Sequence, residues 1–166
     1  MKFITDYFNA EKFESLFFVG IGILAIVSGI YFWFVIKEPF QKGIAIPLIL
    51  IAFIQITVGA IVYVRSPKDI LTVQNIVKIE PEKIQTIEIP RMELVMKNFV
   101  VYRYVEIALM LLGLILYFYF PSISFWKGIG LGLFMQAGFM LLLDFFAEKR
   151  GKEYLQHLTI LMTENV

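Results

Sequence analysis

The chain has 166 residues, of which 59% are hydrophobic and 17% are charged, and its formal net charge is +1. An ordinary soluble domain is about 45 to 50% apolar and about a quarter charged, so these values argue against a typical soluble fold. Because the chain has no cysteine and a single histidine, it also lacks the residues for thiol redox chemistry, thiolate metal sites and bis-histidine haem binding.

The apolar residues form four blocks of about 20 residues, the length that an α-helix needs to cross a bilayer. We predict spans at 15–36, 43–64, 99–120 and 126–147. The expected fold class is an all-α integral membrane protein. It is a four-transmembrane-helix bundle of up-down-up-down topology, with a small cytoplasmic cap formed by the 65–98 loop and two amphipathic termini.

The N-terminal segment 1–14 carries an apolar stripe at helical spacing, formed by Phe3, Ile4, Tyr7 and Phe8. Such a stripe suits either the inner headgroup plane of a membrane or the mouth of the chain's own bundle. The span at 15–36 is longer than the apolar region of a signal peptide, which has about 7 to 15 residues, and no small-x-small cleavage site follows. We therefore expect the N-terminus to stay attached.

The distribution of Lys and Arg predicts the orientation. Two short turns, marked by Pro39 and Pro121, carry three basic residues, whereas the side that holds both termini and the middle loop carries eleven. Because cytoplasmic loops are enriched in Lys and Arg, we predict a multi-pass protein of the cytoplasmic (inner) membrane with both termini in the cytoplasm. The eleven are Lys2, Lys12, Arg65, Lys68, Lys78, Lys83, Arg91, Lys97, Lys149, Arg150 and Lys152; the three are Lys37, Lys42 and Lys127.

The 65–98 segment is the longest polar stretch between spans. Ser66 followed by Pro67 predicts a helix start, with serine as the N-cap and proline at the first helical position. From 70 to 89 the pattern fits two short helices interrupted at Pro81 and Pro90, or a β-hairpin. We favour the helices, because an isolated hairpin is marginally stable in water.

From Arg91 the pattern is helical, so the third helix is predicted to extend beyond the bilayer into the cytoplasm. There it either offers a docking surface to a partner or packs against the chain's own loop and tail. The tail, 148–166, is predicted to be amphipathic, and like the N-terminal stripe it suits a headgroup plane or the bundle mouth. Its stripe consists of Tyr154, Leu155, Leu158, Leu161 and Met162, and its basic residues are Lys149, Arg150 and Lys152.

Polar side chains inside the spans normally face the bundle interior, because hydrocarbon does not solvate them. Gln55 and Gln136 are predicted at matched depth, where the two amides can form an interhelical hydrogen bond. Arg103 and Glu106 are three residues apart and so share one helix face, and Asp144 is predicted at a similar depth in the fourth span.

We predict an Arg103–Asp144 ion pair, with Glu106 completing an intramembrane polar cluster. Two interpretations of this cluster remain open. One is a structural lock between the third and fourth helices, and the other is a proton or cation site.

Small residues mark possible close helix contacts. Gly128 and Gly132 form a GxxxG motif, and Ala25 and Gly29 form a second small-xxx-small pair. Either pair can join two copies of the chain or pack inside one bundle. The motifs are therefore compatible with a homo-oligomer but do not require one.

No catalytic, cofactor or metal-binding motif is present, and no basic face suits a nucleic acid. We therefore expect a non-enzymatic binding or accessory protein in the lipid bilayer, with a protein partner met in the membrane or from the cytoplasm. An immunity-type inhibitor of a membrane-targeting toxin is one concrete form. The alternative is a subunit of a small oligomeric ion channel or transporter that uses Glu106, Arg103 and Asp144, and a lipid-handling enzyme is a weaker third possibility.

Overall fold

The computed structural model describes residues 2–120 and 123–164, and these residues are almost entirely helical. Four long helices follow one another: α1 (Lys2–Tyr31), α2 (Pro39–Ile79), α3 (Ile89–Tyr119) and α4 (Phe125–Glu164). Two π-helical turns adjoin them, η1 (Phe32–Ile36) after α1 and η2 (Ile84–Glu88) before α3. By length and composition, each of the four helices is able to cross a bilayer.

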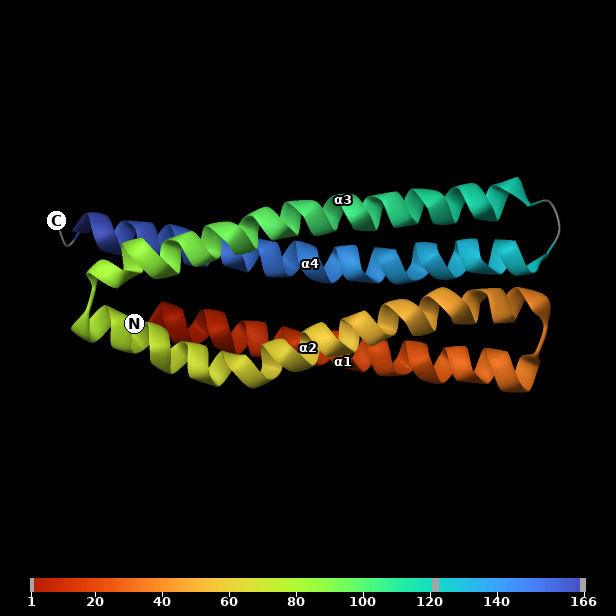
Figure 1. The fold of residues 1–166 in the computed structure, drawn as a ribbon, viewed down its shortest axis with the longest axis horizontal. Coiled ribbons are helices and arrows are strands. Elements are labelled where there is room, and N and C mark those ends of the chain that lie inside the picture. Colours follow the sequence, from red (N-terminus) through yellow and green to blue (C-terminus); the bar gives the residue numbers. More distant parts are fainter. Residues whose placement is uncertain (1, 121–122, 165–166) are drawn as a thin grey trace.

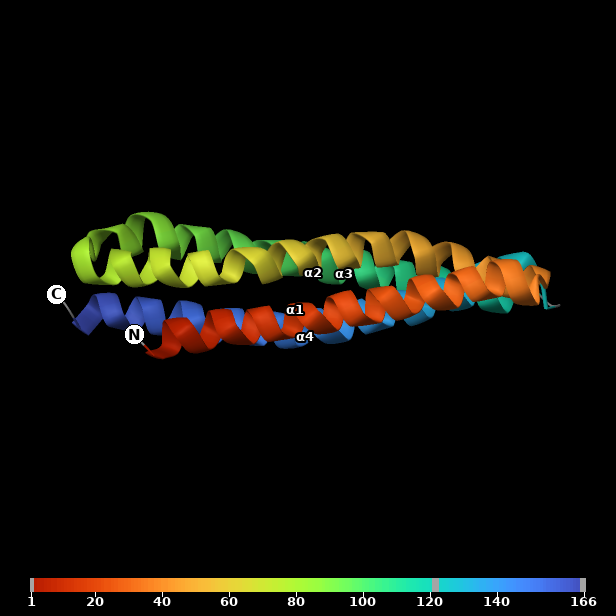
Figure 2. The same cartoon turned by 90° about the horizontal axis from the view of Figure 1, so that it is seen from below.

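The helices run alternately up and down, as predicted (Figure 1). Both ends of the chain and the α2–α3 connection lie at one end of the bundle. Turned by 90°, α2 and α3 form one layer and α1 and α4 the other (Figure 2). Helix α1 packs against α2, α3 packs against α4, and α4 also contacts both α1 and α2. Between α2 and α3 themselves, the described residues make no such contact.

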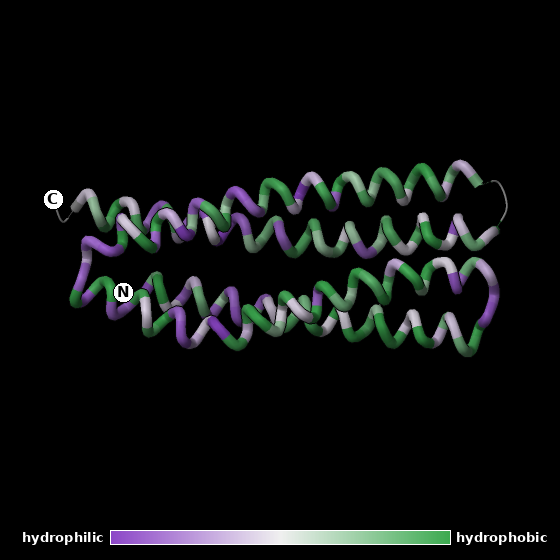
Figure 3. Tube along the Cα trace, in the orientation of Figure 1, coloured by the Kyte–Doolittle hydropathy of each residue, from purple (hydrophilic) through white to green (hydrophobic). Residues whose placement is uncertain are grey.

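Hydropathy divides the bundle along its length. Hydrophilic residues gather at the end that holds the two termini, and the rest of the bundle is mainly hydrophobic (Figure 3). We call the first part the polar end, comprising 2–14, 65–98 and 148–164, and the remainder the apolar shaft.

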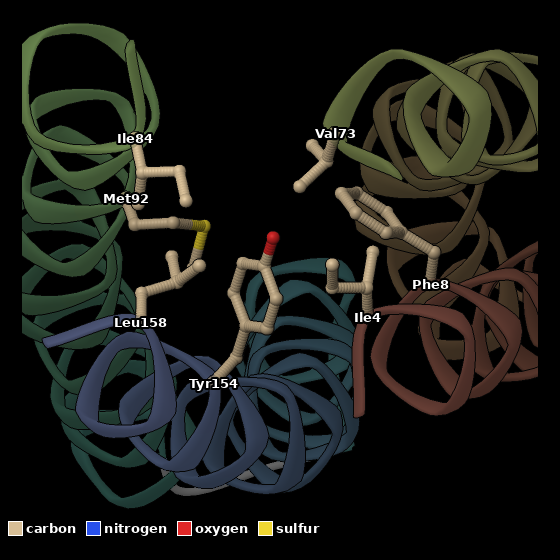
Figure 4. Packing of buried hydrophobic residues seen from close by; sticks show 7 residues of the cluster. All are labelled: Ile4, Phe8, Val73, Ile84, Met92, Tyr154 and Leu158. Atoms are coloured by element: carbon tan, nitrogen blue, oxygen red, sulfur yellow. The ribbon is translucent and has the colours of Figure 1, made fainter. Parts of the chain in front are cut away.

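The polar end has a hydrophobic core of its own, to which all four long helices and η2 contribute (Figure 4). The stripes of the two termini meet here, so they seal the mouth of the bundle instead of leaving an apolar face unpartnered. Fully burying one large apolar side chain stabilises the fold by about 1.5 to 3 kcal/mol, so this core contributes substantially to holding the four helices together at the polar end. Its buried members are Ile4, Phe8, Val73, Ile84, Met92, Tyr154 and Leu158.

A buried ionic network accompanies this core. Glu88 is 3% exposed, and the Arg91 guanidinium donates to both of its carboxylate oxygens, at 2.8 and 2.7 Å. The Tyr154 hydroxyl donates to Glu88 Oε1 at 2.8 Å, and its ring stacks on that of Tyr7 with centroids 4.2 Å apart. Burial raises the pKa of both phenols. These bonds satisfy a carboxylate that would otherwise be costly to bury.

The predicted helix start at Ser66–Pro67 is wrong, because α2 continues through Pro67 to Ile79. A proline inside a helix removes one backbone hydrogen bond and costs about 3 kcal/mol. Tertiary packing further along the helix offsets this loss, because Val73 is buried in the polar-end core. Ser66 is completely buried, and its hydroxyl donates within the same helix to the Val62 carbonyl oxygen at 2.7 Å.

The choice of helices over a hairpin for 70–89 is confirmed, and so is the interruption at Pro81, but the first helix is the end of the 41-residue α2 and not a short separate helix. The interruption at Pro90 is not confirmed, because η2 leads directly into α3 there. Pro90 is the second residue of α3, but η2 precedes α3 without a break, so the missing N–H removes one bond from a continuous helical run.

At the other end of the bundle the helices turn tightly. Lys37 adopts a left-handed conformation (φ 63°) and its N–H bonds back to the Phe32 carbonyl, which ends η1. Pro39 then occupies the start of α2, a favourable position for proline. Pro121, expected to mark the second turn, lies outside the described residues.

The small residues are used inside this single chain, where they allow helix backbones to touch. A Cβ on Gly43 would lie 2.0 Å from the Phe125 carbonyl oxygen, and one on Gly128 would lie 2.0 Å from that of Phe40. A Cβ on Gly132 would meet Ile44 and Pro47 of α2. Helices α2 and α4 therefore cross at backbone contact in the far part of the apolar shaft.

Candidate functional site

A cavity of about 510 Å³ lies inside the bundle and is lined by all four long helices. Its mainly apolar wall extends from Glu11 and Arg65 at the polar end to Leu109 and Met140 in the apolar shaft. Four helices that packed closely along their whole length would leave no such space. The cavity exists because α2 and α3 diverge from each other while each stays packed on its own neighbour.

The cavity opens sideways between α2 and α3. Several of its lining residues are large, apolar and half exposed: Ile54 (59%) and Val58 (46%) on α2, with Tyr102 (51%) and Val105 (52%) on α3. A residue that lines a cavity and is also exposed lies at the rim of its opening. We call the space between these two helices the lateral opening.

The two predicted amides meet beside this cavity. Gln136 Nε2 donates to Gln55 Oε1 at 2.7 Å, and neither residue is more than 1% exposed. The bond joins α4 to α2, as the sequence analysis expected. The Nε2 group of Gln55, which lines the cavity, has no hydrogen-bond partner in the described structure.

Glu106 is the most unusual residue of the cavity wall. It is 3% exposed, and neither of its carboxylate oxygens has a hydrogen-bond partner in the part of the chain that the structure describes. The carboxyl group of Asp144, which also lines the cavity, lies close enough to share a hydrogen bond with Glu106 when one of the two groups is protonated. Two neighbouring carboxyl groups in an apolar wall either carry uncompensated negative charge or retain a proton.

The predicted Arg103–Asp144 ion pair is wrong. Arg103 instead forms its ion pair with Glu148, which lies one helical turn closer to the polar end and is 6% exposed. Lys152 also donates to Glu148, at 2.6 Å, and this hydrogen bond, followed by that from Arg103, holds the pKa of Glu148 below its ordinary value. A long arginine side chain extends toward polar surroundings, so the partner on the polar side is favoured.

Glu148 was missed because the fourth span was assigned to end at 147, which placed Glu148 in the tail. It lies four residues after Asp144 and thus on the same face of α4, a signal that was available in the sequence. The ion pair that joins α3 to α4 is therefore Arg103–Glu148, and Lys152 of α4 adds a second bond to Glu148. Glu106 and Asp144 have no cationic partner at ion-pair distance among the described residues.

Ion pairs between α1 and its neighbours close the polar side of the cavity. Arg65 donates to Glu11 at 2.8 Å, and Arg150 pairs with Glu14. Burial raises the pKa of Glu11 and lowers that of Arg150, and the side chains of both pairs are partly buried, with Arg65 the most exposed at 38%. The acids at this side are therefore neutralised, in contrast to Glu106 and Asp144.

A second hollow, of about 420 Å³, lies between α3 and α4 and shares Glu106 and Asp144 with the cavity. It is open to the outside, and Arg103 and Glu148 form its polar side. Within the described residues, no group of three or more His, Asp or Glu side chains is placed to hold a metal ion.

No protein-family model, curated protein or solved structure matches this chain.

Proposed function

We propose that this chain is an integral protein of the cytoplasmic membrane that binds an apolar or amphipathic ligand through the lateral opening. It acts by binding and not by catalysis. Four apolar helices and the excess of basic residues at the polar end support a multi-pass arrangement with both termini in the cytoplasm.

The cavity is the observation that carries the binding function. Its volume of about 510 Å³ lies within the range of about 300 to 1,000 Å³ that is usual for ligand pockets, and its wall is apolar with a few polar groups. In a bilayer, the lateral opening faces the hydrocarbon. A ligand dissolved in the membrane reaches the cavity without crossing water.

The predicted docking of a protein partner on the cytoplasmic extension of α3 has less surface available than the sequence suggested. Met92 is fully buried in the polar-end core, so part of the extension packs against the chain itself. If the chain has an accessory or inhibitory role, including that of an immunity-type protein, we propose that its protein partner binds at the rim of the lateral opening. Ile54, Tyr102 and Val105 are exposed there.

A channel or transporter subunit is the second candidate, supported by the unpartnered carboxylate of Glu106. A path for ions along the axis of one bundle would have to pass the crossing of α2 and α4. The backbones touch there at Gly43 and Gly128, which leaves no room between these two helices. We therefore rank binding above conduction, and flux measurements on reconstituted vesicles would reverse that order if they detected ion transport.

The topology is directly testable because the natural chain has no cysteine. Lys127→Cys and Lys149→Cys each introduce a single thiol, one at the predicted outer side and one at the predicted inner side. A membrane-impermeant thiol reagent applied to intact cells is expected to label the first and not the second until the cells are opened. The reverse pattern would contradict the proposed orientation.

The binding function is testable by native mass spectrometry of the protein released from mild detergent. Wild-type protein is expected to retain a small hydrophobic molecule from the membrane. Val58→Trp, which fills the rim of the opening, should abolish this retention, whereas Leu24→Trp, on the 67% exposed side chain of α1 away from the cavity, should not. Equal retention by both variants would refute the assignment of the cavity.

A further inference from the structure

The wall of the proposed binding cavity contains a buried carboxylate, that of Glu106, without a hydrogen-bond donor among the described residues. When both acids are ionised, the two carboxylate oxygens of Glu106 lack a donor among the described residues, and the residue is only 3% exposed; the Asp144 carboxyl beside it donates only when it is protonated. A buried glutamate with a purely structural role would have a hydrogen-bond donor at its carboxylate, because an unsatisfied buried polar group is costly. A donor supplied from outside the chain would satisfy it.

The charges around Glu106 define that donor. Arg103 is engaged by Glu148, Arg65 by Glu11, and Arg150 by Glu14, so the cations nearest the cavity already have partners. Glu106 and Asp144 together therefore favour a ligand that brings positive charge. The wall around the two acids is mainly apolar and offers few of the further oxygen ligands that a hard metal ion needs, so an organic cation fits better than a metal.

The rest of the cavity defines the remainder of the ligand. The wall beyond the two acids is apolar, and the lateral opening is bordered by Val58 and Val105. We infer that the cavity binds an amphipathic primary amine, whose ammonium group donates hydrogen bonds to the carboxylate of Glu106 beside Asp144 and whose hydrocarbon chain lies along the apolar wall between α2 and α3. This inference rests on the proposed binding function and specifies its ligand class.

An ammonium group has three N–H donors and a charge, and both properties are used. A neutral alcohol of the same chain length lacks the charge, and a trimethylammonium group keeps the charge but has no N–H. Hydrogen bonds to charged groups contribute enough that their loss weakens binding by about tenfold to a hundredfold. These differences provide three matched probes: dodecylamine, dodecanol and dodecyltrimethylammonium.

Equilibrium binding of radiolabelled probes to the full chain in lipid nanodiscs, with empty nanodiscs subtracted, tests the inference. We expect saturable binding of one dodecylamine per chain, and binding of the other two probes at least tenfold weaker. Glu106→Gln should weaken dodecylamine binding by about tenfold to a hundredfold, to the level of dodecanol. The matched control, Glu93→Gln, changes an exposed carboxylate of the same helix and should leave binding unchanged.

Folding of Glu106→Gln is checked independently by its melting temperature, which should be equal to or above that of the wild type because an unpaired buried charge is removed. Asp144→Asn, which keeps Glu106 intact, provides a second variant and should reduce dodecylamine binding as well. Equal binding of all three probes would overturn the inference, as would a Glu106→Gln protein that is folded and binds dodecylamine normally.

The failure of the inference and that of the proposed function give different results. If Val58→Trp abolishes binding of dodecanol and dodecylamine alike, and the two bind equally, then the cavity binds apolar ligands without selecting the amine. If no probe binds saturably to the wild type, both the ligand class and the binding cavity are refuted.

Discussion

The contact between α2 and α4 at Gly128 provides a sharp test of the packing. A Cβ introduced by Gly128→Ala would lie 2.0 Å from the carbonyl oxygen of Phe40, whereas ordinary contact begins at 3.4 Å. The two helices must therefore separate by the difference, roughly 1.4 Å, because the obstructing atom belongs to the backbone and has no rotamer that avoids the contact. A gap of about 0.5 to 1 Å already loses a quarter to a half of the van der Waals attraction between facing atoms.

Overpacking of a well-packed core costs about 1 to 3 kcal/mol, and we place Gly128→Ala at the upper limit, about 3 kcal/mol, since Gly43 on the facing helix has the reciprocal contact. The control is Gly20→Ala. A Cβ at Gly20 would have no atom of the described residues within 4 Å, so alanine there should raise stability by up to about 1 kcal/mol through its higher helix propensity.

Both variants are purified in the same mild detergent and compared by far-ultraviolet circular dichroism during thermal and denaturant unfolding. The free energy of unfolding should fall for Gly128→Ala and stay equal or rise for Gly20→Ala. Equal stability of the two variants would refute the backbone contact between α2 and α4, and with it the argument that this end of the bundle is closed.

Three further predictions concern the polar groups. Gln55→Leu and Gln136→Leu should each lower the free energy of unfolding, and a double-mutant cycle should give a coupling of about 0.6 to 2 kcal/mol; additive effects would contradict the hydrogen bond. Because burial raises the pKa of Tyr154, the phenol ionises at lower pH in the unfolded chain than in the folded one, so the free energy of unfolding should fall as the pH rises above about 10. Tyr154→Phe should weaken this pH dependence. An unchanged slope of stability against pH would contradict the burial of the phenol. The pKa of Glu148 is held low, chiefly by Lys152, so the contribution of Glu148 to the free energy of unfolding is present above the ordinary pKa of 4.5 and is lost as the pH falls below it. Glu148→Gln should therefore be less stable than the wild type at pH 7 and less sensitive to acid. Equal acid unfolding curves for the two proteins would argue against the ion pairs.

The number of helices, their alternating direction and the Gln55–Gln136 contact follow from sequence patterns. Long apolar blocks have few structural solutions, and two amides at matched depth in neighbouring helices have few alternative partners. These features depend on position along the helix axis, which residue counting gives directly.

Features that depend on rotation and on competition between partners do not follow from counting. The partner of Arg103 was misassigned because depth alone does not distinguish Asp144 from Glu148, which share one face of α4. Helix α2 continues through Pro67 because packing of the polar end outweighs the local preference for a helix start. The cavity was not predicted at all, since the divergence of α2 from α3 is a property of the whole assembly.

The separation of α2 from α3 also has a consequence for biosynthesis. The chain consists of two helical hairpins, α1–α2 and α3–α4, joined by the short segment 80–83. Each hairpin has its own close seam, at Gly22 and Gly29 in the first and at Gly113 and Gly130 in the second. Because contacts close in sequence form early, the first hairpin can assemble while the ribosome is still translating the second. Docking of α2 on α4 requires both hairpins, so the cavity between them is complete only once the second hairpin has formed.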